Sequence, residues 1–157
     1  MSQAQHDWLR LALSPGIGPQ RFLQLIQRFG NAGAALAANR SQLAGILDSD
    51  TIDTLGGELA QQSADAAQAW AQQPGCSLLT LNDDDYPCQL AEAGAAPPLL
   101  FARGRRDLLA TPMLAIVGSR NPTAQGLDNA RAFGRALSEA GWTVVSGLAL
   151  GIDGAAH

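Results

Sequence analysis

Two short segments near the end of the sequence combine glycine, serine and charged residues in a pattern that suits an anion. The first is Gly118-Ser119-Arg120, directly after an apolar run, and the second contains Ser146, Gly147, Gly151 and Asp153, directly after another apolar run. Glycines let backbone N–H groups approach a phosphate, helix N-termini favour negative charge, and an arginine guanidinium offers phosphate a fixed fork of donors. Together the segments predict a phosphate-binding edge.

The residues around these segments predict the elements that position them. The apolar runs 113–117 and 143–145 are each typical of a strand buried on both faces of a sheet. Between them, apolar residues recur every three or four positions, which predicts a helix that Gly141 is suited to end. A further helix is expected to start at or near Asp153. A strand, a helix and a strand form a βαβ unit with parallel strands, so both segments should lie at the carboxyl edge, where open α/β sheets bind ligands.

Known phosphate-binding fingerprints do not match these segments. The first is not G-x-G-x-x-G, no acidic residue closes the second strand, and the chain has no lysine for a P-loop. The alternative is a pair of ordinary α/β turns. In that interpretation Arg120 pairs with a helix carboxylate, while Ser119 and Ser146 cap helices or bond to the turn backbone.

The same residues resemble a known protein family. The stretches AIVGSRNPTAQG and GWTVVSGLALGIDGAAH, in this order, closely resemble the V-G-S-R and S-G-x-A-x-G-I-D-x-x-A-H motifs of the DNA-processing protein A family, also called DprA or Smf. Upstream, Asp85-Tyr86-Pro87 with Leu90, and then 97–101 with Gly104, look like the YP-x-x-L and P-x-x-L-F-x-x-G entry of that family. The resemblance is strongest over residues 80–157.

This resemblance implies a single-stranded DNA-binding protein of natural transformation. Family members protect incoming single strands and help to load the RecA recombinase on them. They are expected to act as homodimers at full length, without enzymatic activity and without a cofactor. The residues that the resemblance carries over to a DNA site are Gly118, Ser119, Arg120, Ser146, Gly147, Gly151 and Asp153.

Two other functions stay open at this stage. Related Rossmann-like phosphoribohydrolases also bind nucleotides at this edge through an early Gly-Ser turn, but their P-G-G-x-G-T motif and catalytic Arg/Glu pair do not occur before residue 157. A partner-binding helical bundle with the α/β part as a platform would have no affinity for DNA. A phosphoribohydrolase assay with adenosine monophosphate distinguishes the first alternative from DNA binding.

Two domains are expected, a helical one over residues 1–73 and a Rossmann-like one over 74–157. The turn Gly16-Ile17-Gly18-Pro19 resembles a helix-hairpin-helix element, which binds the DNA backbone through loop amides, although the same turn also serves to join two helices of a compact bundle. The predicted fold class is α/β, with an N-terminal all-α bundle, SAM-like (sterile-alpha-motif-like) or helix-hairpin-helix, followed by an incomplete Rossmann-like parallel sheet. The predicted helices of the bundle lie near residues 7–13, 22–29, 31–38, 41–47 and 52–72.

The second domain is expected to be truncated at its C-terminus, because a parallel sheet needs both faces covered and family members continue for well over a hundred residues. Strands are expected at 76–81 and 99–102. The arginines at 103, 105 and 106 either extend a phosphate track or belong to a salt-bridged surface loop.

Charge is unevenly distributed along the chain. Residues 1–96 contain four arginines and ten acidic residues, a net −6, whereas residues 97–157 carry a net +2. The net negative charge of the chain argues against a general binder of duplex DNA, because the affinity of such proteins depends on many basic side chains that contact phosphates. No apolar run is long enough to cross a membrane and no signal peptide is evident, so we expect a cytoplasmic protein without a membrane partner. No metal site is predicted, and the acidic run Asp83-Asp84-Asp85 is interpreted as a solvated loop.

Overall fold

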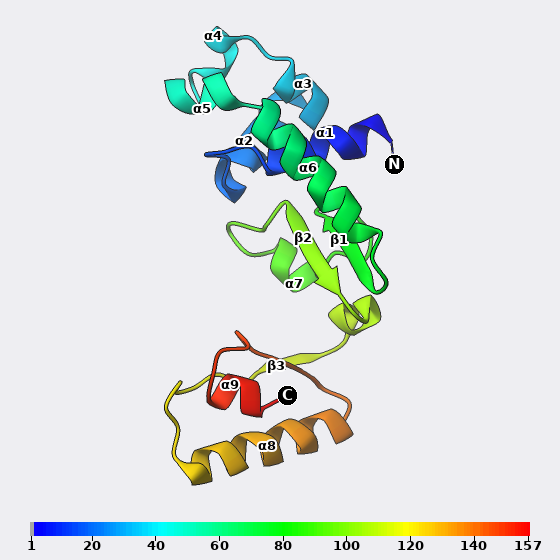
Figure 1. Ribbon diagram of the computed structural model, residues 1–157, viewed down its shortest axis with the longest axis vertical. Helices are drawn as coiled ribbons and strands as arrows, with labels where there is room; N and C mark the ends of the chain where they lie inside the picture. The colour runs from blue at the N-terminus through cyan, green and yellow to red at the C-terminus, as the bar shows by residue number, and fades with distance from the viewer. Residues whose placement is uncertain (1) are drawn as a thin grey trace. The chain divides into compact units, whose positions relative to one another are not determined.

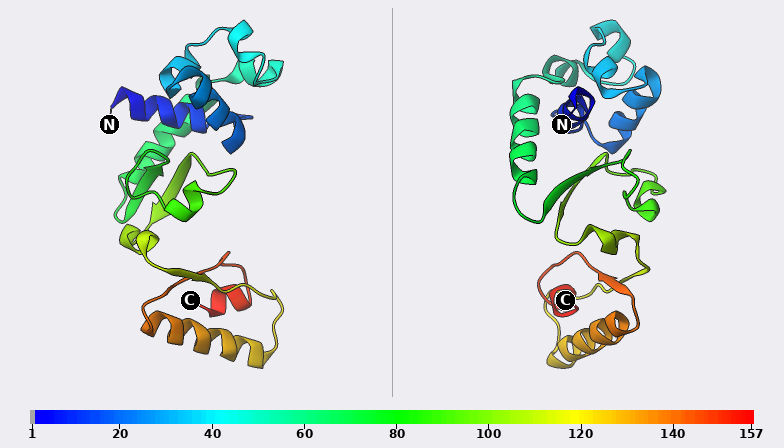
Figure 2. Two further views of the ribbon diagram at one scale, coloured as in Figure 1. Left: turned by 180° about the vertical axis from the view of Figure 1, so that it is seen from behind. Right: turned by 90° about the vertical axis from the view of Figure 1, so that its right-hand side faces the viewer.

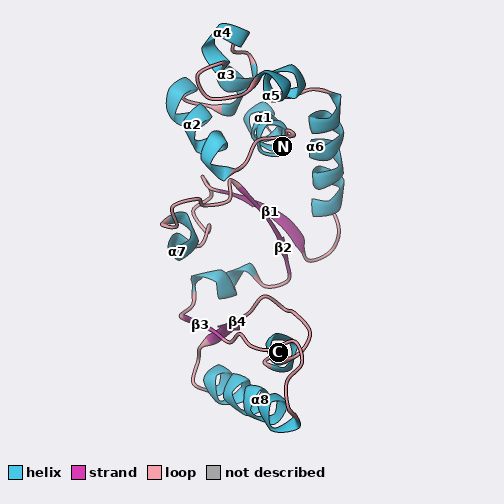
Figure 3. Cartoon of the chain, turned by 90° about the vertical axis from the view of Figure 1, so that its left-hand side faces the viewer, coloured by secondary structure: helices cyan, strands magenta, loops and turns pink. Residues whose placement is uncertain are grey.

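The computed structural model describes residues 2–157, which form two compact units (Figure 1). The first unit ends at Arg106, and the second spans Asp107–His157. Within the described residues, the first unit has six helices before an antiparallel strand pair and a seventh, short helix between its two strands. The second unit contains a parallel strand pair with a long helix between its strands (Figure 3). The predicted fold class is confirmed, whereas the predicted domain boundary after residue 73 stays a prediction.

The helices of the first unit begin at caps that the sequence supplies. Side-chain oxygens of Ser2, Asn31, Asn39 and Asp48 each accept a hydrogen bond from a backbone N–H in the first turn of the helix that follows. These bonds satisfy N–H groups that have no partner within the helix. The helices are α1 (Gln3–Ala12), α2 (Pro19–Phe29), α3 (Ala32–Leu36), α4 (Arg40–Leu43), α5 (Ser49–Thr54) and α6 (Glu58–Ala71).

The single helix predicted over residues 52–72 is wrong, because the structure contains two helices there. Gly56 lies between α5 and α6 with φ of 60°, a left-handed conformation that interrupts a helix and favours glycine. The Gly56 N–H donates to the Ser14 hydroxyl at 2.9 Å, and the Gly56 carbonyl accepts from the Arg10 guanidinium. The break is therefore held by groups at the end of α1.

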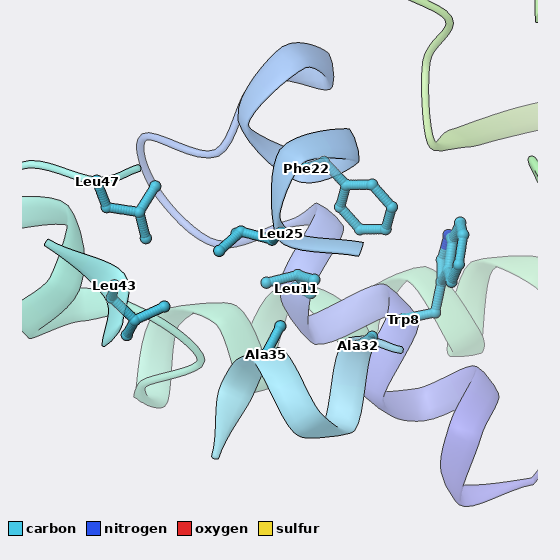
Figure 4. Close-up of a cluster of buried hydrophobic side chains, with 8 residues drawn as sticks. All are labelled: Trp8, Leu11, Phe22, Leu25, Ala32, Ala35, Leu43 and Leu47. Atoms are coloured by element: carbon cyan, nitrogen blue, oxygen red, sulfur yellow. The ribbon is translucent and has the colours of Figure 1, made fainter. Parts of the chain in front are cut away.

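The helices pack around one apolar cluster (Figure 4). Phe22, Leu11 and Leu25 are fully buried, and the ring of Trp8 meets that of Phe22 edge-to-face with centroids 4.7 Å apart. The Trp8 indole N–H also donates to the Pro98 carbonyl at 2.8 Å, so the helical core is bonded to the segment that precedes the second strand. The remaining buried members of the cluster are Ala32, Ala35, Leu43 and Leu47.

The glycine-rich hairpin joins α1 to α2 inside this bundle. Gly16 has φ of 78°, and a side chain there would meet the Thr51 hydroxyl, with only 2.6 Å between the added carbon and the oxygen. The Arg21 guanidinium donates to the Gly16 carbonyl at 3.0 Å and to the Asp48 carboxylate at 2.8 Å. The arginine nearest the hairpin is thus engaged with the bundle itself.

Asp48 makes the stability of this bundle sensitive to acid. Its pKa falls from the ordinary 3.8 to about 2, mainly because the Thr51 backbone N–H donates to the carboxylate, with smaller contributions from the Thr51 hydroxyl and Arg21. Because the folded-state pKa is the lower one, the stabilisation is present above about pH 4 and is lost as the pH falls towards about 2. We expect Asp48→Asn, which keeps the cap and cannot titrate there, to show a smaller loss of thermal stability over this range, measured by circular dichroism.

The control for this experiment is Asp50→Asn, which removes the same charge two residues away without touching the cap. Equal pH dependence in the wild type and in Asp48→Asn would contradict the assignment to Asp48.

The strand pair of the first unit lies against the helical bundle. Strand β1 (Cys76–Thr80) is antiparallel to β2 (Leu99–Arg103), with Leu78 opposite Phe101, and α6 packs on β1 (Figure 2). Both strands lie where the sequence predicts them. A short helix, α7 (Cys88–Ala91), lies in the connection between the strands.

The second unit contains the predicted βαβ arrangement. A 3₁₀ helix, η1 (Arg106–Ala110), leads to β3 (Met113–Ala115), α8 (Ala124–Glu139), β4 (Thr143–Val145) and α9 (Ile152–Ala155). Strands β3 and β4 are parallel and in register, with Met113 opposite Thr143. Gly141 has φ of 86° just after α8, which confirms its predicted role at the helix end.

The expectation that these strands are buried on both faces is wrong for residues 2–157. Leu114 is 37% exposed and Val117 71% exposed, and β3 ends at Ala115 rather than at Val117. The physical reason is coverage, because the apolar pattern of a buried strand is present but these side chains are only partly covered within the second unit. Separately, none of the helices within residues 2–157 is long and apolar enough to cross a membrane.

Candidate nucleic-acid interface

The two glycine-containing segments leave adjacent parallel strands at the same edge of the sheet. Ala115 and Val145 are paired at the ends of β3 and β4, and the Ile116 N–H donates to the Val145 carbonyl at 2.9 Å. Residues 116–123 then lead into α8, and residues 146–151 lead into α9. The structure therefore places the first loop, Gly118 to Arg120, beside the second loop at the carboxyl ends of the strands, the edge that open α/β sheets use for ligands.

Asp153 connects the two loops. Its side chain is buried, and its two carboxylate oxygens accept hydrogen bonds from the Gly118 N–H at 3.0 Å and the Gly147 N–H at 3.1 Å. Helix α9 starts at Ile152, and its N-cap residue Gly151 forms no side-chain cap, so the helix starts at a neighbour of Asp153. The carboxylate thus accepts hydrogen bonds from two backbone N–H groups that would otherwise be available to a phosphate. The same two bonds join the first loop to the second.

Gly151 allows the start of α9 to approach the first loop very closely. It has φ of 95°, and a Cβ there would lie 2.2 Å from the Ser119 carbonyl oxygen and 2.9 Å from the Arg120 Cα. The Ile152 N–H donates to that same Ser119 carbonyl at 3.1 Å. A Cβ at Gly118 would likewise lie 2.8 Å from side-chain carbons of Ile152. Both glycines are needed for contact between the loops.

The two serines bond to the backbone of their own turns. Ser119 Oγ accepts from the Asn121 N–H at 3.0 Å, and Ser146 Oγ accepts from the Leu148 N–H at the same distance. Ser146 Oγ also lies 2.8 Å from His157 Nε2. The cap of α8 comes from Thr123, whose hydroxyl accepts from the Gly126 N–H. These bonds match the turn-backbone alternative for the serines and shape both loops.

Arg120 carries a charge that is not neutralised by any residue within 2–157. It is exposed, and within residues 2–157 it forms no hydrogen bond or ion pair, in contrast to Arg131, which pairs with Asp128 at 3.2 Å. The surface ion pair considered for Arg120 is therefore not formed in the described part of the chain. An exposed guanidinium beside a rigid loop and ahead of a helix N-terminus can bind an oxyanion without first breaking another contact.

Two leucines of the second loop were not singled out in the sequence. Leu148 is 72% exposed and Leu150 is 84% exposed, and Leu148 has φ of 51°, unusual for a residue with a bulky side chain. Their positions between Gly147 and Gly151 do not indicate exposure, since apolar residues are ordinarily expected to pack in the protein interior.

Asp83, Asp85 and Arg106, three of the other charged candidates, have ordinary partners. No group of histidine, cysteine or acidic side chains within residues 2–157 is arranged to hold a metal ion. In the run Asp83-Asp84-Asp85, the carboxylate of Asp83 accepts from the Thr80 N–H at 2.6 Å, while Asp85 pairs with Arg106. The salt-bridged alternative for the arginine segment thus holds for Arg106.

Comparison with known proteins gives the same family over both units. The family model for DNA recombination-mediator protein A matches residues 77–157, and the model for the DprA-like N-terminal HHH domain matches residues 2–39. Protein Smf of Synechocystis sp. is 34% identical over 160 residues, which cover 98% of this chain and 40% of that protein. The DNA processing protein DprA of Streptococcus pneumoniae is 46% identical over 84 residues, covering 54% of this chain and 28% of that protein.

A solved structure agrees with these matches. The X-ray structure of DNA processing protein A from Streptococcus pneumoniae superimposes with a TM-score of 0.72 at 30% sequence identity, covering 100% of this chain and 53% of that chain. The chain thus spans less than half the length of the curated relatives it matches and about half of this solved one.

Proposed function

Because the chain belongs to the DNA-processing protein A (DprA/Smf) family, we propose that it is part of a single-stranded DNA-binding protein of natural transformation. In this proposal the whole protein protects incoming single strands, acts as a homodimer and promotes loading of the RecA recombinase on the strand. The edge formed by Gly118, Ser119 and Arg120 makes the first contact with the DNA backbone, and the second loop supports it.

The observation that carries the proposal is the exposed guanidinium of Arg120, unpaired within residues 2–157, on a loop that is hydrogen-bonded to α9. Asp153 and the close approach at Gly151 attach the loop to α9, so less conformational entropy is lost when a phosphate binds than for an unattached loop. Helix α8 is 16 residues long and has no acidic residue in its first turn, so its N-terminus adds favourable potential for an anion.

The roles of the seven predicted site residues then differ. Arg120 binds a phosphate directly, while Gly118, Gly147, Gly151 and Asp153 position the loops through backbone contacts. Ser119 and Ser146 set the turn conformations. A site with one free arginine is expected to bind weakly, because affinity for single strands grows with the number of phosphates contacted and with stacking of the bases. The proposal therefore requires further contacts along the strand.

Replacing Arg120 with alanine tests this assignment. We expect Arg120→Ala to weaken binding of a fluorescein-labelled oligo-dT strand by about tenfold, and to reduce the slope of log affinity against log salt by about 0.7 for the lost phosphate contact. The folded state should be unaffected, because the side chain is exposed and has no partner within residues 2–157. Fluorescence anisotropy over a salt series measures both quantities.

Arg131→Ala is the matched control, since it removes the same charge from the same unit at a residue already paired with Asp128. Equal affinity of Arg120→Ala and the wild type at matched salt would remove Arg120 from the site. A wild-type chain without any affinity for single strands at low salt would overturn the proposed function, and the same edge should then be screened against nucleotides.

A further inference from the structure

The first unit carries a partly exposed aromatic pair. It is distant in sequence from the two loops at residues 116–123 and 146–151. Phe101 on β2 is 51% exposed, and its ring meets that of Trp70 on α6 edge-to-face, with centroids 5.2 Å apart and planes inclined at 66°. This contact packs one side of the phenyl ring and leaves much of it open to solvent. An exposed and immobilised ring is the feature on which single-strand binding proteins stack bases.

A free arginine lies on the same face of the strand. Side chains two residues apart in a strand point to the same side, so Arg103 projects beside Phe101, and it lies opposite Cys76 in the antiparallel register. Arg103 is exposed and forms no hydrogen bond or ion pair within residues 2–157, whereas Arg106 pairs with Asp85. The chain turns sharply just beyond, at Gly104, whose N–H donates to the Gly75 carbonyl at 2.8 Å.

We propose that Trp70, Phe101 and Arg103, here called the β2 patch, form a second contact for single-stranded DNA, in which a base stacks on Phe101 and the adjoining phosphate binds Arg103. Charge favours this occupant, because the Arg103 guanidinium beside the ring has no partner within residues 2–157 and can bind a phosphate without first breaking another contact. A protein partner would also accept an aromatic ring and an arginine, but only a nucleic acid offers a flat ring and an anion at each repeat of its chain.

This inference rests on the proposed function and deepens it. The loop edge supplies a phosphate contact but no aromatic side chain among residues 118–123 and 146–151, and stacking is a major source of affinity for single strands. The β2 patch supplies that missing chemistry. It also gives a role to Arg103, the arginine of segment 103–106 that has no partner within residues 2–157.

The test uses the whole 157-residue chain and two substitutions that separate stacking from packing. Phe101→Leu keeps an apolar side chain against Trp70 but offers no ring, and Phe101→Tyr keeps the ring. We expect Phe101→Leu to weaken oligo-dT binding by about tenfold and Phe101→Tyr to remain within about twofold of the wild type. An oligonucleotide with abasic sites should lose the same factor with the wild type and show no further loss with Phe101→Leu.

Arg103→Gln should weaken binding and reduce the salt slope by about 0.7. The matched controls are Leu59→Ala, which alters another exposed apolar residue of the first unit, and Arg28→Gln, which removes an exposed charge whose guanidinium lies over the Phe29 ring. Neither control should change affinity by more than about twofold, since neither lies in the β2 patch.

The outcomes separate this inference from the proposed function. If Arg120→Ala weakens binding while Phe101→Leu and Arg103→Gln behave like the controls, the β2 patch is overturned and the proposed function stands; the patch is then available to a protein partner. If the wild type binds no single strand at all, both fail. Photocrosslinking of 5-iododeoxyuridine DNA to a peptide containing Phe101 or Trp70 would support direct contact, and crosslinks confined to other peptides would contradict it.

Discussion

Gly151→Ala is expected to unfold the second unit or to destabilise it by about 3 kcal/mol or more. Alanine at φ of 95° carries a conformational penalty of about 1–3 kcal/mol, and its Cβ would overlap the Ser119 carbonyl oxygen, to which the distance is 2.2 Å. Because the obstructing atoms belong to the backbone, no side-chain rotation relieves the clash. The start of α9 would have to move away from the first loop, and the 3.1 Å bond from the Ile152 N–H to Ser119 would break.

The effect can be measured unit by unit through the indole N–H resonances of the three tryptophans. Trp142 reports the second unit, whereas Trp8 and Trp70 report the first. In Gly151→Ala we expect the Trp142 signal to move to the unfolded position at lower urea, while the other two are unchanged.

Gly141→Ala is the matched control for this substitution. Gly141 also has a positive φ, 86°, but a Cβ there would meet nothing within 4 Å, so only the conformational penalty of about 1–3 kcal/mol applies. If Gly151→Ala were no less stable than Gly141→Ala, the close approach of the two loops would not contribute to stability. DNA binding by Gly151→Ala should fall together with the folded fraction.

Asp153→Ala is expected to have the second largest effect, a destabilisation on the order of 2–3 kcal/mol together with a loss of DNA affinity. The substitution removes two charge-assisted hydrogen bonds, each typically about 1.5–3 kcal/mol, and water can replace part of them because Gly118 and Gly147 are exposed. Once these bonds are gone, the first loop is held to α9 by the Ile152 N–H bond to Ser119 and by the close approach at Gly151, so the backbone that carries Arg120 is less restrained.

Hydrogen exchange at the Gly118 and Gly147 amides measures this effect directly, and both amides should lose protection in Asp153→Ala. Asp153→Asn should be intermediate, because an amide group can accept one of the two bonds but places a donor against the other N–H. Asp128→Ala removes the same charge from the exposed side of α8 and should leave both amides protected.

The direction of the change in DNA affinity decides the role of Asp153. Weaker binding by folded Asp153→Ala follows if the carboxylate positions the loops for Arg120. Tighter binding would show instead that the carboxylate competes with phosphate for the two loop amides, and that the residue restrains binding.

Much of the local structure follows from short-range sequence patterns. The βαβ unit, the helix end at Gly141 and a strand at 76–81, observed at 76–80, follow from the sequence, because apolar spacing and glycine position act over a few residues. The break at Gly56 was missed, since Leu59–Gln73 contains strong helix formers and the bonds that hold the break come from Ser14 and Arg10, more than forty residues away.

The sequence by itself determined the family resemblance, the fold class and which two loops share an edge, because these depend on residue types at fixed spacing. Only the tertiary structure decided which polar groups meet. Asp153 bonds to Gly118 across 35 residues, Arg21 is taken up by Asp48 across 27, and Arg120 and Arg103 find no partner within residues 2–157. Such pairings depend on how separate elements pack, and an arginine that is committed to a carboxylate looks the same in sequence as one that is free to bind phosphate.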